Sequence, residues 1–288
     1  MLVRMRKSFR SALAAVLVSC VLAPPSFAAD PSKGGKWDGP ISSNWGGIYI
    51  GIYAARAWGD LDLRTDTGAV TGSSYFQFPE NTASVNQAGS GALSPDTGLA
   101  GVQIGINTQK GGWVFGLEAD YGAFNLGVSR GAAGVPYPAL GSIPFKYSVR
   151  AEMETDWLAT ARARVGWAFQ PGLLLYATGG LAVTNIRVSN SFSDDAPEQG
   201  VGGSSSNELK AGWTLGGGAE WALARNWSLK AEYLYLNFGS ASASSSINCG
   251  PAVAAACAAF VPPVTPNPFS TSADLAAHIA RVGLNYKF

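Results

Sequence analysis

The chain has little of what a soluble enzyme or a nucleic-acid-binding protein is built from. Only 14% of its 288 residues are charged, and it has one histidine and three cysteines. After the N-terminal region no segment offers 18 consecutive uncharged apolar residues, so the sequence predicts no transmembrane helix there. In contrast, 47% of the residues are hydrophobic, with 36 glycines and nine tryptophans. This combination suits a β protein whose outer face meets lipid.

The first 28 residues have the pattern of a secretory signal peptide. Four basic residues precede an apolar run over residues 12–23, and Ala28 ends a small-x-small cleavage site. The alternative is lipoprotein processing at Cys20, because the residues before it resemble a lipobox. Cleavage of residues 1–28 is expected to leave a flexible periplasmic segment over 29–44, followed by one domain over 45–288.

The signal peptide also decides the charge of the mature chain. Its removal takes away four basic and no acidic residues, which leaves 16 basic residues against 19 acidic ones. A slightly acidic chain of this kind is not built to bind nucleic acid.

The stretch from Trp157 to Trp167 has the clearest strand pattern. Read with a period of two, both tryptophans and the alanines share one face, while Arg162 and Arg164 share the other. A tilted strand needs about 9–11 residues to cross a bilayer. Apolar residues outside, polar residues inside and aromatic residues at both ends are typical of a transmembrane barrel strand. A strand of a soluble sandwich remains the alternative for this stretch alone.

Seven further segments have comparable patterns, and short turns alternate strictly with long loops between them. The expected strands cover residues 47–58, 100–108, 113–122, 157–167, 173–184, 213–223, 227–236 and 278–288. The expected long loops cover residues 60–97, 123–155, 187–211 and 239–276. This layout predicts an all-β fold: an eight-stranded antiparallel up-and-down transmembrane β-barrel with short periplasmic turns and four long extracellular loops.

Two sets of side chains follow from this threading. Aromatic rings prefer the headgroup level of a bilayer, and the strand ends carry two aromatic girdles, formed by Trp58, Trp113, Trp157, Trp167, Trp213, Trp221, Trp227 and Tyr286. The inward faces carry four acidic and four basic residues: Glu118, Asp120, Glu220, Glu232, Arg162, Arg164, Lys230 and Arg281. An eight-stranded barrel is only just wide enough for side chains to fill it, so this balanced set predicts a salt-bridged network in the lumen. A charged constriction in an open pore is the alternative.

The sequence offers no set of residues with the pattern of an active site or a metal site. No serine lies two positions from His278 to share its strand face, although a serine on another strand remains open. The two mature cysteines and one histidine do not have zinc-ligand spacing. We therefore expect no enzyme activity, no metal and no other cofactor. Cys249 and Cys257 lie in one expected outer loop of an exported chain, where we expect them to form a disulfide.

Five segments of the chain resemble the outer-membrane immunogenic proteins of alphaproteobacteria, a family of small porin-like or OmpA-like barrels. These segments are residues 45–51, 113–120, 157–166, 175–180 and 278–288. The resemblance implies an eight-stranded barrel in the Gram-negative outer membrane, exposed at the cell surface as an antigen, with a role in envelope integrity or surface interaction. A narrow porin for ions or small solutes is the alternative function, and a lipid-modifying enzyme is a third.

The same resemblance implies the partners of the protein. Phe288 looks like the terminal aromatic residue by which the barrel assembly machinery recognises such chains during biogenesis. We further expect contacts with outer-membrane lipid and lipopolysaccharide, and host or environmental surface ligands at the long loops.

Overall fold

The computed structural model describes residues 44–70, 72–140, 145–169 and 172–288. The expected signal peptide with Cys20, and the expected periplasmic segment except for Asn44, lie outside the described residues. Within the described residues, no helix is both long and apolar enough to cross a membrane.

The described chain is dominated by eleven β-strands that pair antiparallel with one another, together with two short α-helices and one 3-10 turn. The strands are β1 (Gly47–Asp66), β2 (Gly91–Leu93), β3 (Asp96–Lys110), β4 (Trp113–Ala123), β5 (Gly127–Pro136), β6 (Lys146–Glu154), β7 (Trp157–Phe169), β8 (Leu173–Asp194), β9 (Val201–Ala222), β10 (Trp227–Ile247) and β11 (Asn267–Lys287). The helices are α2 (Pro79–Gly89) and α3 (Ala254–Ala259), and the 3-10 turn is η1 (Pro138–Leu140).

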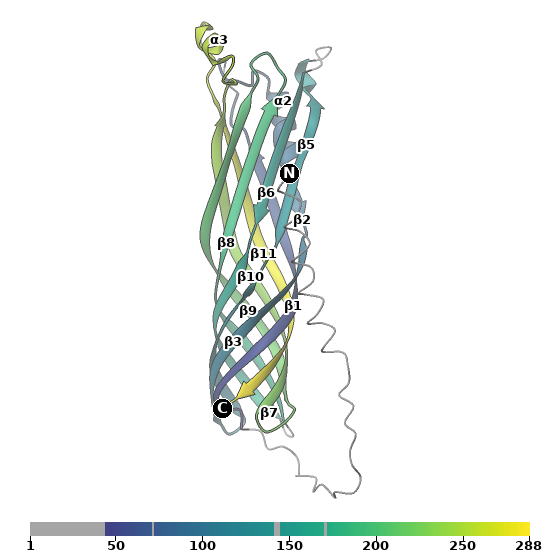
Figure 1. Cartoon of the computed structure of the whole chain (residues 1–288), viewed down its shortest axis with the longest axis vertical. Coiled ribbons are helices and arrows are strands. Elements are labelled where there is room, and N and C mark those ends of the chain that lie inside the picture. Colours follow the sequence, from purple (N-terminus) through teal and green to yellow (C-terminus); the bar gives the residue numbers. More distant parts are fainter. Residues whose placement is uncertain (1–43, 71, 141–144, 170–171) are drawn as a thin grey trace, which may run out of the picture.

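Eight of the strands close into a ring (Figure 1). Their order is β1, β3, β4, β7, β8, β9, β10 and β11, and β11 pairs again with β1. At the closing pair, Tyr49 lies opposite Lys287 and Asp66 lies opposite Ser270. Successive residues alternate between a buried inner face and an exposed outer face, which is the period-two pattern of a sheet with two different environments. Closure leaves no free sheet edge in this part of the molecule.

Several ring strands run far beyond the ends predicted from the sequence, so the predicted loops are wrong in extent. β8 and β9 are 22 residues long and only residues 195–200 lie between them, although a loop was predicted over 187–211. The predicted loop over 239–276 likewise contains the ends of β10 and β11. The cause is composition: these extensions are rich in Ser, Gly and Asn and lack clear alternation of hydrophobic residues, but pairing with a neighbouring strand satisfies their backbone groups.

The other two predicted loops also contain regular structure. The stretch 60–97 holds the end of β1, α2 and β2, and the stretch 123–155 holds the β5–β6 hairpin. This hairpin pairs with the end of β8, with Tyr147 opposite Asp194. Strand pairings between segments this far apart in the chain leave no local signal in the sequence.

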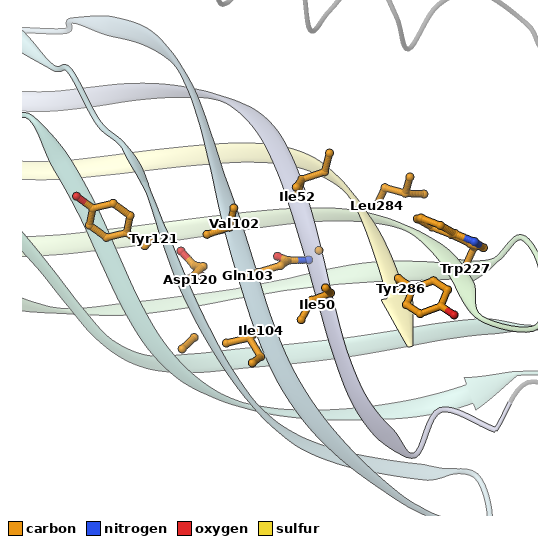
Figure 2. Close-up of a pocket in the computed structure, with 12 residues that line it drawn as sticks. Ile50, Ile52, Val102, Gln103, Ile104, Asp120, Tyr121, Trp227, Leu284 and Tyr286 are labelled. Atoms are coloured by element: carbon orange, nitrogen blue, oxygen red, sulfur yellow. The ribbon is translucent and has the colours of Figure 1, made fainter. Parts of the chain in front are cut away.

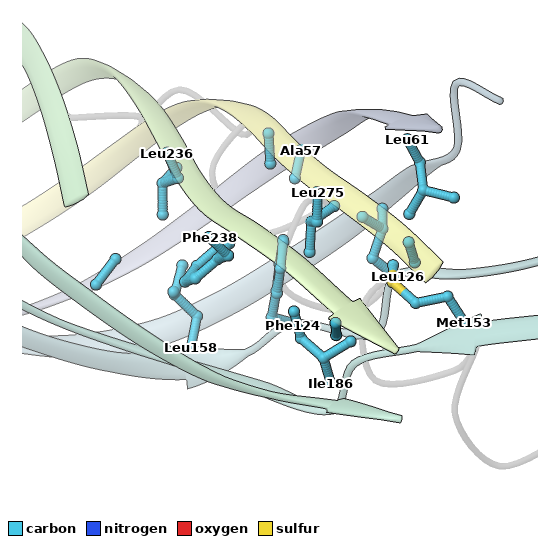
Figure 3. Packing of buried hydrophobic residues seen from close by; sticks show 14 of the residues in the cluster. Ala57, Leu61, Phe124, Leu126, Met153, Leu158, Ile186, Leu236, Phe238 and Leu275 are labelled. Atoms are coloured by element: carbon cyan, nitrogen blue, oxygen red, sulfur yellow. The ribbon is translucent and has the colours of Figure 1, made fainter. Parts of the chain in front are cut away.

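β3, β4 and β7 end near the level of Trp58 and Trp157, and beyond it the other strands form two facing sheets, which we call the upper sandwich. One sheet contains β5, β6, β8 and β9, and the other contains β10, β11, β1 and β2. Figure 3 shows part of the apolar core between them, including Phe124, Met153, Ile186 and Phe238. The upper sandwich therefore has a core of its own, continuous with the interior of the ring.

Candidate functional site: the charged centre of the ring

The middle of the ring holds a cluster of charged side chains that point inward from five strands. β4 supplies Glu118 and Asp120, β7 supplies Arg162 and Arg164, β9 supplies Glu220, β10 supplies Lys230 and Glu232, and β11 supplies Arg281. Every one of these residues is at most 6% exposed. The structure thus brings all eight residues of the predicted lumen network into one cluster of four acids and four bases.

Glu118 is the centre of this cluster, because it contacts all four basic side chains. Its carboxylate lies 2.6 Å from Lys230 Nζ, 3.1 Å from Arg281 and 3.7 Å from Arg164, and it also pairs with Arg162. The other acids share the same cations. Arg162 lies 2.8 Å from Asp120 and 3.0 Å from Glu232, Arg281 lies 3.2 Å from Asp120, and Arg164 lies 3.1 Å from Glu220.

Neutral polar side chains complete the hydrogen bonds of the carboxylates. The Tyr49 hydroxyl donates to Glu118 at 2.5 Å, Tyr176 donates to Glu232 at 2.8 Å, and Asn285 donates to Glu220 at 2.8 Å. Arg164 also lies over the Tyr49 ring, with 4.8 Å from its guanidinium carbon to the ring centroid. Buried charges are tolerated only when paired and hydrogen-bonded, so these neutral residues are part of the site. Sequence reasoning missed Tyr49, because both faces of the first strand are fairly apolar and left its orientation open. It gave no role to Tyr176 or Asn285.

Apolar layers cover the charged cluster at both ends. Toward the short turns lies a buried group of Trp45, Val114, Leu174 and Tyr176. Trp45 is 6% exposed, and its backbone is fixed by hydrogen bonds with Gln109 at 2.7 Å and Asn107 at 3.1 Å. On the other side the cluster meets the large apolar core that continues into the upper sandwich. The charges are therefore enclosed between two largely apolar layers. Their polar contacts with the cluster include the hydroxyls of Tyr176, which donates to Glu232, and Tyr53, which donates to Asp120 at 3.5 Å.

The outer face of the ring is an apolar band between two levels of aromatic residues. At the short-turn level Trp113 packs against Trp167 and Trp227 against Tyr286, each at 5.1 Å between ring centroids, and Trp221 is 55% exposed. At the opposite level lie Trp58, Trp157 and Trp213, with Tyr121 and Tyr235 as neighbours. Figure 2 shows a shallow depression in this wall, where exposed Ile50, Ile52, Val102 and Ile104 lie between Trp227 and Tyr121. All eight residues of the predicted girdles thus lie at the two edges of this apolar band.

His278 lies at the level of the upper aromatic residues. Its Nδ1 lies 2.6 Å from the Tyr233 hydroxyl, its Nε2 lies 3.2 Å from Asp60, and its ring stacks on Trp58. The hydroxyl beside the histidine therefore belongs to a tyrosine, and sequence reasoning missed both Tyr233 and Asp60 because they come from different strands.

Two hydrogen bonds and a disulfide bond lie at the top of the molecule. Tyr75 and Tyr137 both donate to Asp194 Oδ2, at 2.7 and 2.6 Å. Burial, with the carboxylate beside them, raises the pKa of both hydroxyls well above the ordinary tyrosine value, so they remain donors. Cys249 and Cys257, the predicted pair, are joined by a disulfide bond that ties Cys257 of α3 to the chain before the helix.

A closed antiparallel ring with an apolar outer face, two aromatic levels and a charged interior defines the class of transmembrane β-barrels. The chain matches the model of the outer membrane protein beta-barrel domain over residues 12–288. It is 30% identical to the 31 kDa outer-membrane immunogenic protein of Brucella melitensis biotype 1, over 99% of this chain and 100% of that protein. It is 25% identical to the 25 kDa outer-membrane immunogenic protein of Brucella abortus biovar 1, over 78% and 84% of the two chains.

A third relative is the 22 kDa outer membrane protein of Rhizobium leguminosarum bv. viciae, with 30% identity over 48% of this chain and 52% of that one. The chain therefore belongs to the outer membrane protein β-barrel family, with alphaproteobacterial relatives that include outer-membrane immunogenic proteins. It is an all-β barrel of the outer membrane, and the resemblance seen in the sequence is confirmed.

Proposed function

We propose that this protein is a structural and surface-exposed barrel that supports envelope integrity and surface interaction, with its lumen closed by paired charges. The observation that supports this most is the contact of Glu118 with all four basic side chains, between two apolar layers. A path through the lumen would require several ion pairs to separate where little water can replace them. The proposal includes no catalytic activity and no cofactor.

The proposal also assigns an orientation and partners. The eight ring strands run up and down, with the short turns in the periplasm and the four other connections, including the upper sandwich, outside the cell. The support is that three short connections lie at the end of the ring that also holds Gly47 and Phe288. The girdles would then contact lipid and lipopolysaccharide, and the outer connections would carry any host or environmental ligand.

The closed lumen is tested by single-channel recording. We expect the refolded, heat-modifiable protein to leave a planar bilayer silent, and Arg56→Ala to do the same, because Arg56 is exposed on the outer wall. Stable small steps, with an ion selectivity that shifts on Arg164→Ala, would contradict the proposal and favour the narrow porin. One observation favours that second function: Arg164 Nη2 is buried and has no hydrogen-bond partner in the described residues, which leaves a donor for a small solute.

Recognition of Phe288 by the assembly machinery is the last part of the proposal. The residue is 69% exposed, its backbone N–H donates to Ile48 at 3.0 Å, and its ring packs on Tyr286. Deletion of Phe288 should leave export intact and prevent most of the protein from reaching the outer membrane, as measured by cell fractionation. Phe260→Ala, at a similarly exposed phenylalanine away from the barrel end, is the matched control. Normal outer-membrane levels after the deletion would refute this role.

A further inference from the structure

The upper sandwich has an unpaired seam between β9 and β10. The ladder that joins these strands ends at Trp213 and Asn237. Beyond that point β9 pairs with β8 and β10 pairs with β11, and the two strands meet again only at a bridge between Val201 and Asn248. We call residues 202–212 of β9 and 238–247 of β10 the β9–β10 seam. Across the described chain, no strand pairs with either edge of this seam.

On the opposite side of the upper sandwich, other segments of the chain cover the strands at the gap between the two sheets. The seam differs because no segment covers it in the described chain. On the covered side α2 lies against β1, β5 and β6, and the Arg130 side chain of β5 reaches β2, where a Cβ on Gly91 would lie 2.8 Å from it. Proteins usually protect exposed edges with charges, bulges or covering segments. Within the seam, the charged residues on the inner face of β9 are Glu208 and Lys210, and they pair with each other at 2.9 Å. The rest of this edge therefore has no charged side chain to protect it.

Asn190 fixes the width of the seam. Its Oδ1 accepts a hydrogen bond from the Ser204 backbone N–H at 2.9 Å, and its Nδ2 donates to the Ala243 carbonyl at 3.2 Å. A peptide group inside a sheet does the same, because its C=O and N–H point to opposite neighbouring strands. Asn190 is 5% exposed, so its amide is held in this place. At this point the gap between β9 and β10 is therefore one strand wide, and a side-chain amide stands where one peptide group of a strand would lie.

The side chains around the seam leave room for a backbone. Gly202, Ser204 and Ser206 line the inner side of β9 and are half-buried, and Ala241 and Ala243 line β10. The seam narrows at both ends, since a Cβ on Gly212 would lie 2.1 Å from the Asn237 carbonyl and one on Gly202 would lie 2.9 Å from that of Ser246.

We propose that the β9–β10 seam is a strand-addition site for an extended segment of a partner polypeptide with small residues at alternate positions. The added strand would run antiparallel to one edge and parallel to the other, displace the Asn190 amide and give both edges ladder hydrogen bonds. Gly, Ala or Ser should face inward, because buried core residues such as Val188, Phe238 and Ala243 already fill the interior behind the seam. The site would face a partner outside the cell, and this part rests on the orientation in the proposed function.

The probe is a fluorescent synthetic peptide with the sequence of residues 238–247, added to the folded full chain in detergent micelles. Its control carries N-methyl groups at alternate residues, which keeps every side chain and removes one row of donors. Binding is measured by anisotropy to wild type, Asn190→Ala and Asn185→Ala. Asn185 is the matched control, because it lies on the same strand but its amide faces outward and donates to Asp156.

We expect Asn190→Ala to bind the peptide about tenfold more tightly than wild type or Asn185→Ala, since no amide has to be displaced. N-methylation should weaken binding about tenfold. Equal affinity for the two peptides, no binding to Asn190→Ala, or a dimer that forms through the seam without peptide would overturn the proposal.

Hydrogen exchange on the wild-type protein gives a second test that does not depend on the variant. Apart from the amide of Ser204, which Asn190 holds, the amides of 202–212 and 238–247 that point into the seam should exchange faster than those of 213–222, and excess peptide should protect only these amides. Slow exchange without peptide would mean that the seam is closed and would overturn the site. Labelling of Ser205→Cys, on the exposed face of β9, by an impermeant maleimide on intact cells tests the outward orientation separately, so failure of that part is distinguishable from failure of the site.

Discussion

Replacement of Arg162 by alanine is expected to lower the free energy of unfolding by about 3–5 kcal/mol, because it removes one partner of a buried ion-pair network. Arg162 contacts Glu118, Asp120 and Glu232, and its side chain is fully enclosed. Without it, four carboxylates in the cluster face three cations in a space that admits little water. The loss is measured by urea unfolding in micelles, followed by tryptophan fluorescence and heat-modifiable gel mobility.

Arg56→Ala is the matched control for this change. Arg56 also pairs with a carboxylate, that of Asp96, but the two side chains are 72% and 55% exposed. An exposed pair contributes less than about 1 kcal/mol, so this variant should unfold close to the wild-type urea concentration. If Arg162→Ala were no more destabilising than Arg56→Ala, the cluster would be hydrated, and the narrow porin would become the better reading of the lumen.

The residues of the charged cluster could be predicted from the sequence because a membrane barrel enforces a strict period of two. Arg162 and Arg164 on one face, opposite an alanine stripe, leave one orientation in which charges avoid lipid. The same rule located both aromatic levels. In each case the signal is local, since each residue and its outward neighbour are adjacent in the chain.

Which acidic side chain contacts which basic side chain in the cluster could not be predicted. That Glu118 contacts cations from three other strands depends on the tilt and stagger of the strands, which decide which inward residues share a level. The hydrogen bonds from Tyr176 to Glu232 and from Asn285 to Glu220 could not be predicted for the same reason.

The upper sandwich was missed for a different reason. Its strands continue through Ser- and Gly-rich segments with weak alternation, and the pairing of β6 with β8 joins stretches that no turn connects. The Asn190 bridge depends on three strands at once. A β-rich segment outside the membrane is therefore harder to recognise than one inside it, because water imposes no lipid-facing pattern on its outer surface.

Arginine at Leu117 is expected to destabilise the barrel by about 2–4 kcal/mol, because Leu117 lies midway between the two aromatic levels on the outer face. Leu209→Arg is the matched control on β9, four residues beyond Trp213 of the upper level. The two leucines are 63% and 70% exposed, so both substitutions should change the stability by similar amounts if both positions faced water.

The difference in unfolding free energy between the two variants therefore shows which of the two positions contacts lipid. In bilayer vesicles we expect Leu209→Arg to remain within about 0.5 kcal/mol of wild type, as surface substitutions in water usually do, while Leu117→Arg unfolds at clearly lower urea. Equal, small effects would mean that the apolar band is not where the barrel meets the bilayer. Equal, large effects would place β9 beyond Trp213 in lipid, and the β9–β10 seam could then not receive a polypeptide from the aqueous phase.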